Sequence, residues 1–256
     1  KPMLLAVDVG NTNIEFGIFD GQAIIAKCRL GTNREITSDE VGIFVCQFLM
    51  LNSIEKEKIQ DAVISSVVPQ VMYSLTNAMR KYFGVKALVV GENIPINVIN
   101  RYGNPKEVGA DRLVNALAVF RKYGAPAIVV DFGTATTFDA VNEEGAYLGG
   151  AIFPGIKISM DALFLKTAKL PRVEITDPGS VIGGTTVESM QAGLVYGYIG
   201  AIRNITDEMK KLLPTPIMVA TGGLSSFFGQ ISNLFDRVDG NLTLEGIRMI
   251  YEDYKK

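Results

Sequence analysis

Two aspartates stand where a carboxylate could do chemistry, because each ends an apolar run and each is followed at the second position by glycine. Asp8 ends the run that begins at Met3, and Asp131 ends the run that begins at Ala127. In such a turn, glycine lets backbone N–H groups approach phosphate oxygens, nearby hydroxyls donate hydrogen bonds, and the aspartate holds a cation or orients water. The pattern indicates a phosphate and cation site, although a plain turn after a strand could use the same residues.

The motif occurs twice, with the two aspartates 123 residues apart (131 minus 8). Both copies are rich in threonine or asparagine, in Asp8–Asn13 and in Asp131–Thr137, which favours phosphate binding and a duplicated fold with a nucleotide between its halves. Asp177-Pro178-Gly179 also matches, but no apolar run precedes it and its proline indicates a turn. A third apolar run ends in Thr221-Gly222-Gly223, where a purine could lie flat against backbone that carries no Cβ.

Gly109-Ala110-Asp111-Arg112 combines a carboxylate with a guanidinium at the start of a predicted helix. Asp111 could act as a base on a hydroxyl while Arg112 binds a substrate carboxylate as a fork. The alternative, which spacing alone favours, is that Asp111 stabilises the helix dipole and Arg112 lies on a solvated face. Three segments stay open between local structure and substrate contact: Tyr102 in a polar loop, the glycine-rich Gly149–Gly155, and Gly183–Thr186 as a helix cap or a donor pair.

The composition narrows the function classes. The chain has 256 residues, 48% of them hydrophobic, so it can bury a large core and we expect two compact domains. A net charge of −2 gives no basic footprint, so we expect no nucleic-acid partner. The apolar runs fall short of the ~20 residues that span a membrane, and we expect neither a span nor a signal peptide.

The side chains that are missing or scarce also limit the chemistry. The chain has no histidine, which excludes histidine acid–base chemistry, Ser-His-Asp triads and histidine-ligated zinc. Its cysteines, Cys28 and Cys46, show no Cys-x-x-Cys spacing, and we expect both to be small buried hydrophobes in a cytoplasmic protein.

Both halves of the chain present the same order of predicted elements: strand, Asp-x-Gly, hairpin, strand and helix. The predicted strands are 3–9, 13–19, 22–30, 62–67, 87–90, 127–130, 136–141, 147–152 and 217–220. The predicted helices are one opened by Thr37–Glu40 and ending near Leu51, then 69–83, 108–123, one opening at Pro154, 187–212, and further helices filling the remainder to Lys256. We place one domain over 1–123 and the other over 124–256.

Taken together, the motifs resemble the type III pantothenate kinase family. The matching segments are Asp8–Thr12, Gly109–Arg112, Asp131–Thr137, Gly149–Gly155 and Thr221–Gly223, and their order and spacing also fit. The family belongs to the acetate and sugar kinase/Hsp70/actin superfamily. The resemblance implies an α/β fold of two duplicated ribonuclease H-like domains, each a mixed five-stranded sheet flanked by helices, with the nucleotide in the cleft between them.

The resemblance also implies an activity. The expected enzyme is a phosphotransferase with an alcohol group as acceptor, which uses ATP to phosphorylate pantothenate to 4′-phosphopantothenate in the first step of coenzyme A biosynthesis. Two alternatives remain: a kinase of the superfamily that acts on a sugar or another carboxylate, and a non-catalytic regulatory protein that binds nucleotide. The presence of Asp8, Asp111, Arg112 and Asp131 together favours an enzyme, because a protein without turnover has no physical need for all four.

Carried over residue by residue, the resemblance assigns roles to this chain. The nucleotide phosphate loop would be residues 8–15, with magnesium near its first residue: Asp8, Val9, Gly10, Asn11, Thr12, Asn13, Ile14 and Glu15. Asp131 would ligate a monovalent cation, potassium or ammonium, and Thr134 would contact ATP. The pantothenate pocket would be formed by Tyr102, Gly109, Ala110, Asp111 as proton acceptor, Arg112 and Thr186. One departure is Gly184, which stands where a lysine is expected and leaves the local contacts there open.

The helix predicted from Val187 carries more apolar side chains than one core-facing stripe needs, among them Met190, Tyr196 and Ile199. Small residues between them permit close approach of another helix. A helix buried on all sides within the second domain would explain the same pattern. The resemblance favours an obligate symmetric homodimer, in which the neighbouring subunit completes the pantothenate pocket.

Overall fold

The computed structural model describes residues 2–256, which form two compact units. Unit 1 comprises the chain up to Val98, Gly103–Ala118 and Leu242–Lys256, and unit 2 comprises Ile99–Tyr102 and Val119–Asn241. The single boundary after residue 123 stays a prediction. The grouping by contacts departs from it most clearly at the C-terminal helix, because α7 packs on strands β1 and β4 of unit 1.

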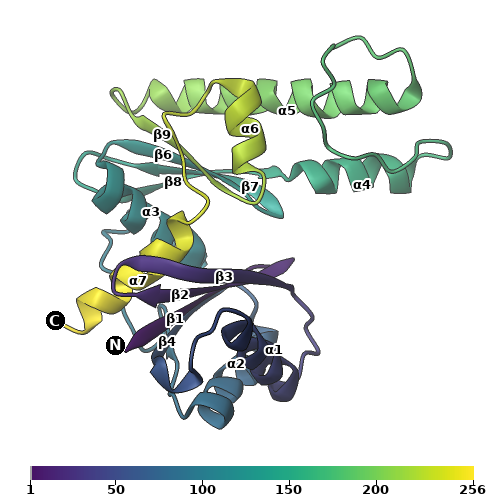
Figure 1. Ribbon diagram of the computed structural model, residues 1–256. Helices are drawn as coiled ribbons and strands as arrows, with labels where there is room; N and C mark the ends of the chain where they lie inside the picture. Colours follow the sequence, from purple (N-terminus) through teal and green to yellow (C-terminus); the bar gives the residue numbers. More distant parts are fainter. Residues whose placement is uncertain (1) are drawn as a thin grey trace. The chain divides into compact units, whose positions relative to one another are not determined.

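The sheet of unit 1 has the strand order β3-β2-β1-β4-β5 (Figure 1). An antiparallel meander is followed by two strands parallel to the first: β1 (Met3–Val9), β2 (Asn13–Asp20), β3 (Ala23–Gly31), β4 (Ile59–Ser66) and β5 (Leu88–Val89). Parallel strands need a crossover, and helices α1 (Ser38–Leu51) and α2 (Met72–Ala78) provide it. The helix predicted over 69–83 exists in three parts, since a 3-10 turn precedes α2 and a π-helical turn follows it.

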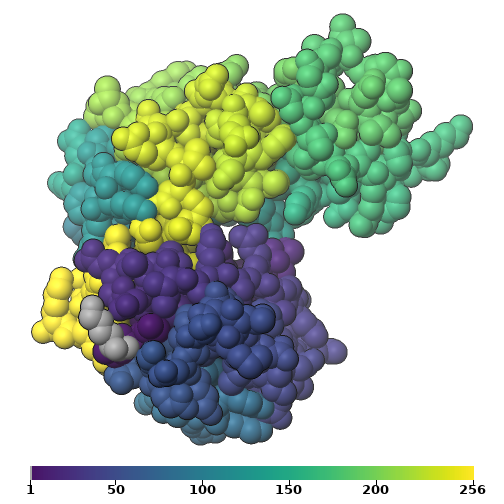
Figure 2. All heavy atoms as spheres, viewed as in Figure 1, coloured from purple at the N-terminus to yellow at the C-terminus, as the bar shows by residue number. Residues whose placement is uncertain are grey.

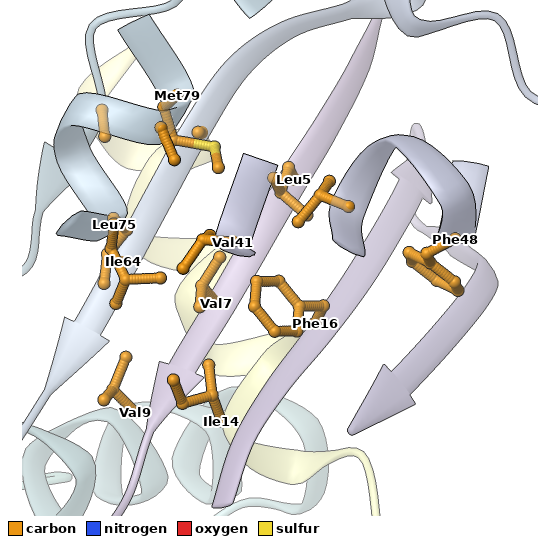
Figure 3. Packing of buried hydrophobic residues seen from close by; sticks show 14 of the residues in the cluster. Leu5, Val7, Val9, Ile14, Phe16, Val41, Phe48, Ile64, Leu75 and Met79 are labelled. Carbon is orange, nitrogen blue, oxygen red and sulfur yellow. The ribbon is translucent and has the colours of Figure 1, made fainter. Parts of the chain in front are cut away.

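One face of this sheet carries the larger core of unit 1, seen in Figure 3. Its members are the side chains of alternate strand positions and of the two crossover helices, including Leu5, Val7, Val9, Ile14, Phe16, Ile64, Val41, Leu75 and Met79. Helix α1 begins where the sequence predicted, because Thr37 and Glu40 form a reciprocal capping box.

The opposite face of the same sheet is covered by α3 (Ala110–Tyr123) and α7 (Leu242–Tyr254). Its apolar layer comes from the other set of strand positions and from the two helices: Leu4, Ala6, Phe19, Val63, Val114, Leu117, Leu244, Ile247 and Ile250. Asp8 projects to this face near the C-terminal end of β1. The apolar layer therefore packs directly next to one candidate site residue.

The sheet of unit 2 repeats the topology, with the order β10-β9-β6-β7-β8. Its strands are β6 (Ala127–Phe132), β7 (Ala135–Val141), β8 (Tyr147–Pro154), β9 (Ile217–Gly222) and β10 (Arg237–Val238). The first three form an antiparallel meander, and β9 and β10 run parallel to β6. The expected duplicated fold of two mixed five-stranded sheets is therefore confirmed. The expectation that only helices follow residue 220 is wrong, because β10 adds an edge strand there.

Helices α4 (Ile156–Lys166), α5 (Thr186–Lys210) and α6 (Ser225–Ser232) complete unit 2. The helix expected to open at Pro154 begins two residues later, since Pro154 still pairs with Ala135 at the end of β8. In Figure 2 the green atoms of α4 and the following segment stand out from the rest of this unit. None of the helices between residues 2 and 256 is long and apolar enough to cross a membrane, and the cytoplasmic location stays a prediction.

The expectation that both cysteines are small buried hydrophobes holds only in part. Both are free and half-buried. Burial, and after it the Glu15 carboxylate, raises the pKa of Cys28 to about 12, and burial also raises the pKa of Cys46. A thiol that stays protonated is a poor nucleophile, so neither cysteine is a candidate for covalent chemistry.

Candidate functional site

The first candidate phosphate turn joins β1 to β2 in unit 1. The Gly10 N–H donates to the Asn13 carbonyl over 2.9 Å, and Thr32 Oγ1 donates to the Gly10 carbonyl over 2.7 Å. These bonds fix a tight turn in which Asn11 and Thr12 are exposed. Hydroxyl and amide groups held outward on a fixed turn can donate to phosphate oxygens.

Not every residue of the 8–15 segment can offer its side chain to a ligand. Val9 and Ile14 are buried in the core, so they can contribute only backbone atoms. Asp8 and Glu15 are partly buried and lie opposite each other in the antiparallel pair. Glu15 lies 3.5 Å from an Arg29 nitrogen, which makes it an ion-pair partner within the sheet.

The Gly109–Arg112 motif lies at the N-terminus of α3, as predicted. Asp111 Oδ1 accepts from the Arg112 N–H at 2.9 Å, so the carboxylate folds back over the first turn of its own helix. A Cβ on Gly109 would lie 2.5 Å from that oxygen, which explains why glycine precedes it. Arg112 is buried, with 8% of its surface exposed. The alternative that Arg112 lies on a solvated helix face is therefore wrong.

Burial raises the pKa of the Asp111 carboxyl above its ordinary value of 3.8, and the Arg112 N–H and guanidinium only partly oppose that shift. A carboxylate that holds a proton more readily than usual is a better base. Perturbed acids of this kind concentrate at functional sites.

Val67 connects this motif to the phosphate turn within unit 1. Its N–H donates to the Val9 carbonyl over 3.1 Å, directly after Asp8, and its Cγ1 would lie 3.5 Å from a Cβ on Gly109. The folded chain therefore brings residues 8–15 and 109–112 to the same end of the unit 1 sheet, although about a hundred residues separate them.

The second candidate phosphate turn joins β6 to β7 in unit 2, and two other glycine motifs lie against it. Strand pairing sets Asp131 beside Thr221 and Phe132 beside Gly222. A Cβ on Gly222 would lie 2.5 Å from Asp131 Oδ1, and one on Gly155 would overlap the Thr134 carbonyl. Three motifs far apart in sequence therefore meet at one end of this sheet, where Thr134 is exposed.

The close approach of Gly155 to this turn gives a testable consequence. Gly155→Ala is expected to displace the Gly133–Thr134 turn, since the new Cβ would also lie 3.0 Å from the Gly133 carbonyl oxygen. Overpacking of this kind costs roughly 1–3 kcal/mol, and we expect the KM for ATP to rise at least about tenfold if the turn holds phosphate. Steady-state kinetics and a melting curve measure both effects. Gly240→Ala is the control, because no atom lies near a Cβ there; equal KM values in the two variants would contradict the prediction.

Tyr102 packs inside unit 2. Its ring would lie 3.1 Å from a Cβ on Gly149, a residue with φ of 116°, and its centroid is 6.2 Å from that of Tyr147. Tyr147 in turn donates to the buried Asp139 over 3.1 Å. Gly149 on β8 therefore leaves room for the ring of Tyr102.

Thr186 lines a cavity of about 710 Å³ between α4 and the start of α5. Tyr102 is not among the lining residues, which are Leu163, Leu170, Gly183, Gly184, Thr185, Thr186, Ser189, Met190, Gly193 and Leu194. Thr185 caps α5 in a capping box with Glu188, so the cap alternative for this cluster is confirmed. The Gly184 N–H donates to Glu188 Oε2 over 2.8 Å, so this loop is held by the cap where a lysine was expected.

Cation binding here would depend on few protein ligands. No three acidic or cysteine side chains gather into a metal-binding cluster within residues 2–256. Magnesium in kinases is commonly held by one or two carboxylates together with water and substrate phosphates. Asp8 beside the candidate phosphate turn fits that mode, and Asp131, whose Oδ1 lies close to the backbone of Gly222, offers a carboxylate that a monovalent cation could use.

One polar side chain was missed by sequence reasoning. Ser65 is fully buried at the end of β4, directly opposite Asp8 in the parallel pair. The sequence does contain a hint of this serine, because the apolar run Ala62–Ile64 is followed by Ser65-Ser66, as the runs before Asp8 and Asp131 are followed by aspartate. Serine is so common at strand ends that only the folded structure singles it out.

The sequence comparisons agree with one another. A family model described as type III pantothenate kinase matches residues 4–208. A type III pantothenate kinase from Moorella thermoacetica is 50% identical over 251 residues, which is 98% of this chain and 99% of that protein.

Solved structures share the fold at low sequence identity. A conserved protein from Campylobacter jejuni, described as a candidate Baf family transcriptional activator, has a TM-score of 0.61 and 20% identity, and each chain covers 98% of the other. The activator of 2-hydroxyisocaproyl-CoA dehydratase from Clostridium difficile, solved with bound ADPNP, has a TM-score of 0.54 and 11% identity, with 99% of this chain and 97% of that chain covered. At these identities the likeness concerns the fold alone.

Proposed function

This chain belongs to the type III pantothenate kinase family, and we propose that it transfers the γ-phosphoryl group of ATP to the 4′-hydroxyl of pantothenate. The products would be 4′-phosphopantothenate and ADP, in the first step of coenzyme A biosynthesis. The observation that carries the proposal beyond the family is the Asp111 carboxylate, whose pKa is raised by burial and which shares one end of a sheet with a phosphate turn.

Asp111 is the proposed general base. As the pantothenate hydroxyl oxygen forms its bond to the γ-phosphorus, the bond from that phosphorus to the ADP oxygen breaks, and the hydroxyl proton passes to the Asp111 carboxylate. Phosphoryl transfer needs little covalent help from the protein, so in-line positioning and charge neutralisation supply most of the rate. A base is worth about 10²- to 10⁴-fold on top of that.

Arg112 is proposed to bind the pantothenate carboxylate. Its guanidinium is held near the start of α3 and is largely withdrawn from water. A buried guanidinium makes a strong bidentate contact with a carboxylate, which lysine cannot copy. Tyr102 and Thr186 are proposed to contact the remainder of the substrate.

Residues 8–15 and Thr134 are proposed to bind the phosphates of ATP. The exposed Asn11 and Thr12 can donate from one turn and Thr134 from the other. Asp8 would hold magnesium through water, and that ion would neutralise charge on the β- and γ-phosphate oxygens when bound. Asp131 would hold potassium or ammonium.

We also propose a symmetric homodimer formed through α5. This helix is not buried on all sides within unit 2: Val195 and Tyr198 pack in the core, while Tyr196 is 43% exposed. Gly193, Gly197 and Gly200 lie on the open side, and a Cβ at each would meet no atom. Because Gly193 also lines the cavity beside Thr186, a partner seated on this face would reach a candidate substrate contact.

The dimer has a direct test in Gly197→Phe. In a monomer this side chain would point into open space and leave the fold intact, whereas in the proposed dimer it would separate the helices. We expect light scattering to give twice the chain mass of 27.8 kDa for the parent protein, and a monomer with little activity for the variant. An obligate interface would bury more than ~2,000 Å² in total.

Gly240→Phe is the matched control, since it adds the same side chain at another open glycine. It is expected to remain dimeric and active. A parent protein that is monomeric and fully active would contradict both the dimer and the shared site.

The activity is tested by ADP release coupled to NADH oxidation, with pantothenate, glucose and acetate offered separately. Turnover with pantothenate alone is the expected result. Turnover with glucose or acetate would support another kinase of the superfamily. ATP binding without turnover on any of them would support the non-catalytic alternative.

A further inference from the structure

The hydroxyl of Ser65 is a buried polar group that the proposed mechanism does not use. None of its surface is exposed, and its Oγ finds no hydrogen-bond partner among the described residues. Leaving a hydroxyl unpaired in a protein interior costs about 1–3 kcal/mol, so such a group in a native fold calls for a functional explanation.

Strand register places Ser65 in a polar row with two acids. Asp8 on β1 pairs with Ser65 on β4 in the parallel ladder and with Glu15 on β2 in the antiparallel ladder. Residues paired across neighbouring strands project to the same face of a sheet, and the strands lie about 4.8 Å apart. The Ser65 hydroxyl and the Asp8 carboxylate are therefore neighbours.

The face that carries this row is the one covered by α3 and α7. The preceding pair on the same face, Ala6 and Val63, belongs to the apolar layer with Val114 and Leu244. The polar row thus follows the apolar layer along the strands. It lies at the end of the sheet where Val67 contacts both the candidate phosphate turn and Gly109.

We propose that Ser65 is a positioning residue for Asp8. Its hydroxyl donates a hydrogen bond to the neighbouring Asp8 carboxylate when the nucleotide binds, which orients that carboxylate toward the magnesium of the nucleotide. The inference rests on the proposed function, since it assigns Asp8 to the nucleotide's magnesium.

The test is Ser65→Ala, with Ser66→Ala as the matched control. Ser66 is the next residue on the same strand, projects to the opposite face, and accepts a hydrogen bond from the Val68 N–H at 3.0 Å. ATP binding is measured by calorimetry without pantothenate, once with magnesium and once with EDTA. Melting temperature and kcat are measured on the same preparations.

Ser65→Ala is expected to weaken ATP binding about tenfold in magnesium and less than about twofold in EDTA, and to lower kcat by about 10- to 100-fold, the range for partners that orient a metal-binding group. Its melting temperature should be unchanged or higher, because an unpaired buried hydroxyl is removed. Ser66→Ala should lower the melting temperature and leave the magnesium dependence intact. In an Asp8→Asn background, Ser65→Ala should change ATP binding less than about twofold, since coupled residues are not additive.

Several results would overturn the inference. Ser65→Ala with unchanged ATP binding and kcat would show that the hydroxyl has no functional role. Equal weakening in magnesium and in EDTA would separate Ser65 from the metal, and a lower melting temperature with normal kinetics would make it structural. Because calorimetry needs no pantothenate, a parent protein that fails to phosphorylate pantothenate would refute the proposed function without deciding this one.

Discussion

Replacing Asp111 with asparagine is expected to lower kcat for pantothenate phosphorylation by at least about 100-fold, the lower end of what a general base contributes. Asparagine keeps the shape and can still accept from the Arg112 N–H, but it cannot take up the hydroxyl proton. ATP affinity should stay within about twofold, because the lost interaction belongs to the transition state. Rapid-quench kinetics and calorimetry measure the two quantities.

The same substitution has an opposite effect on stability. Because the folded protein raises the pKa of Asp111, the ionised carboxylate disfavours folding at neutral pH, and this cost fades as the pH falls toward the ordinary value of 3.8. The melting temperature of Asp111→Asn should therefore equal or exceed that of the parent at pH 8, with the difference shrinking on acidification. For the same reason, kcat/KM of the parent should fall as acid protonates the base, at a pH above 3.8.

Asp39→Asn is the matched control, since Asp39 occupies the first turn of α1 in the same unit. Hydrogen bonds from Lys81 and Tyr82 lower the pKa of Asp39, so its ionised form stabilises the fold above the ordinary value of 3.8 and that contribution is lost in acid. Asp39→Asn should melt lower at neutral pH and keep its kcat. Near-normal kcat in Asp111→Asn would remove the base from the mechanism.

Activity is expected to be very low in sodium-only or Tris-only buffer and to recover when potassium or ammonium is added. The reason is the proposed site at Asp131, where the carboxylate lies beside the backbone of Gly133 and Gly222. Sodium is smaller and holds its water more tightly, so a site built for a larger ion binds it poorly. Initial rates at constant ionic strength, with magnesium fixed, measure the effect.

Asp131→Asn should shift the potassium concentration for half-maximal rate upward by about tenfold or more, since a full charge is removed from the ion's partner. Asp177→Asn is the control: Asp177 also begins an Asp-x-Gly sequence, but it is exposed and accepts a hydrogen bond from the Gly179 N–H at 2.9 Å. Equal rates of the parent in sodium, Tris and potassium would eliminate the monovalent site.

Local rules explain how much of the fold could be predicted. Continuous or alternating apolar runs indicated the strands, and the Thr37 cap and Gly124 indicated helix ends within a residue or two. The predictions were wrong where the pairing of strands in the folded protein determines the secondary structure. Pro154 resembles a helix start but completes a strand opposite Ala135, and the two-residue β10 exists because its neighbour β9 offers an open edge.

The sequence by itself determined the two Asp-x-Gly motifs, the duplicated order of elements and the family, because these depend on residue types at short spacing. It could not decide whether Arg112 is solvated, how α5 is buried, or that Ser65 lies beside Asp8. Those facts depend on which strands pair and which helices cover them. A pairing between residues 57 positions apart (65 minus 8) leaves no local trace in the sequence, because hydrophobic burial of the sheet face, and no nearby residue, fixes its register.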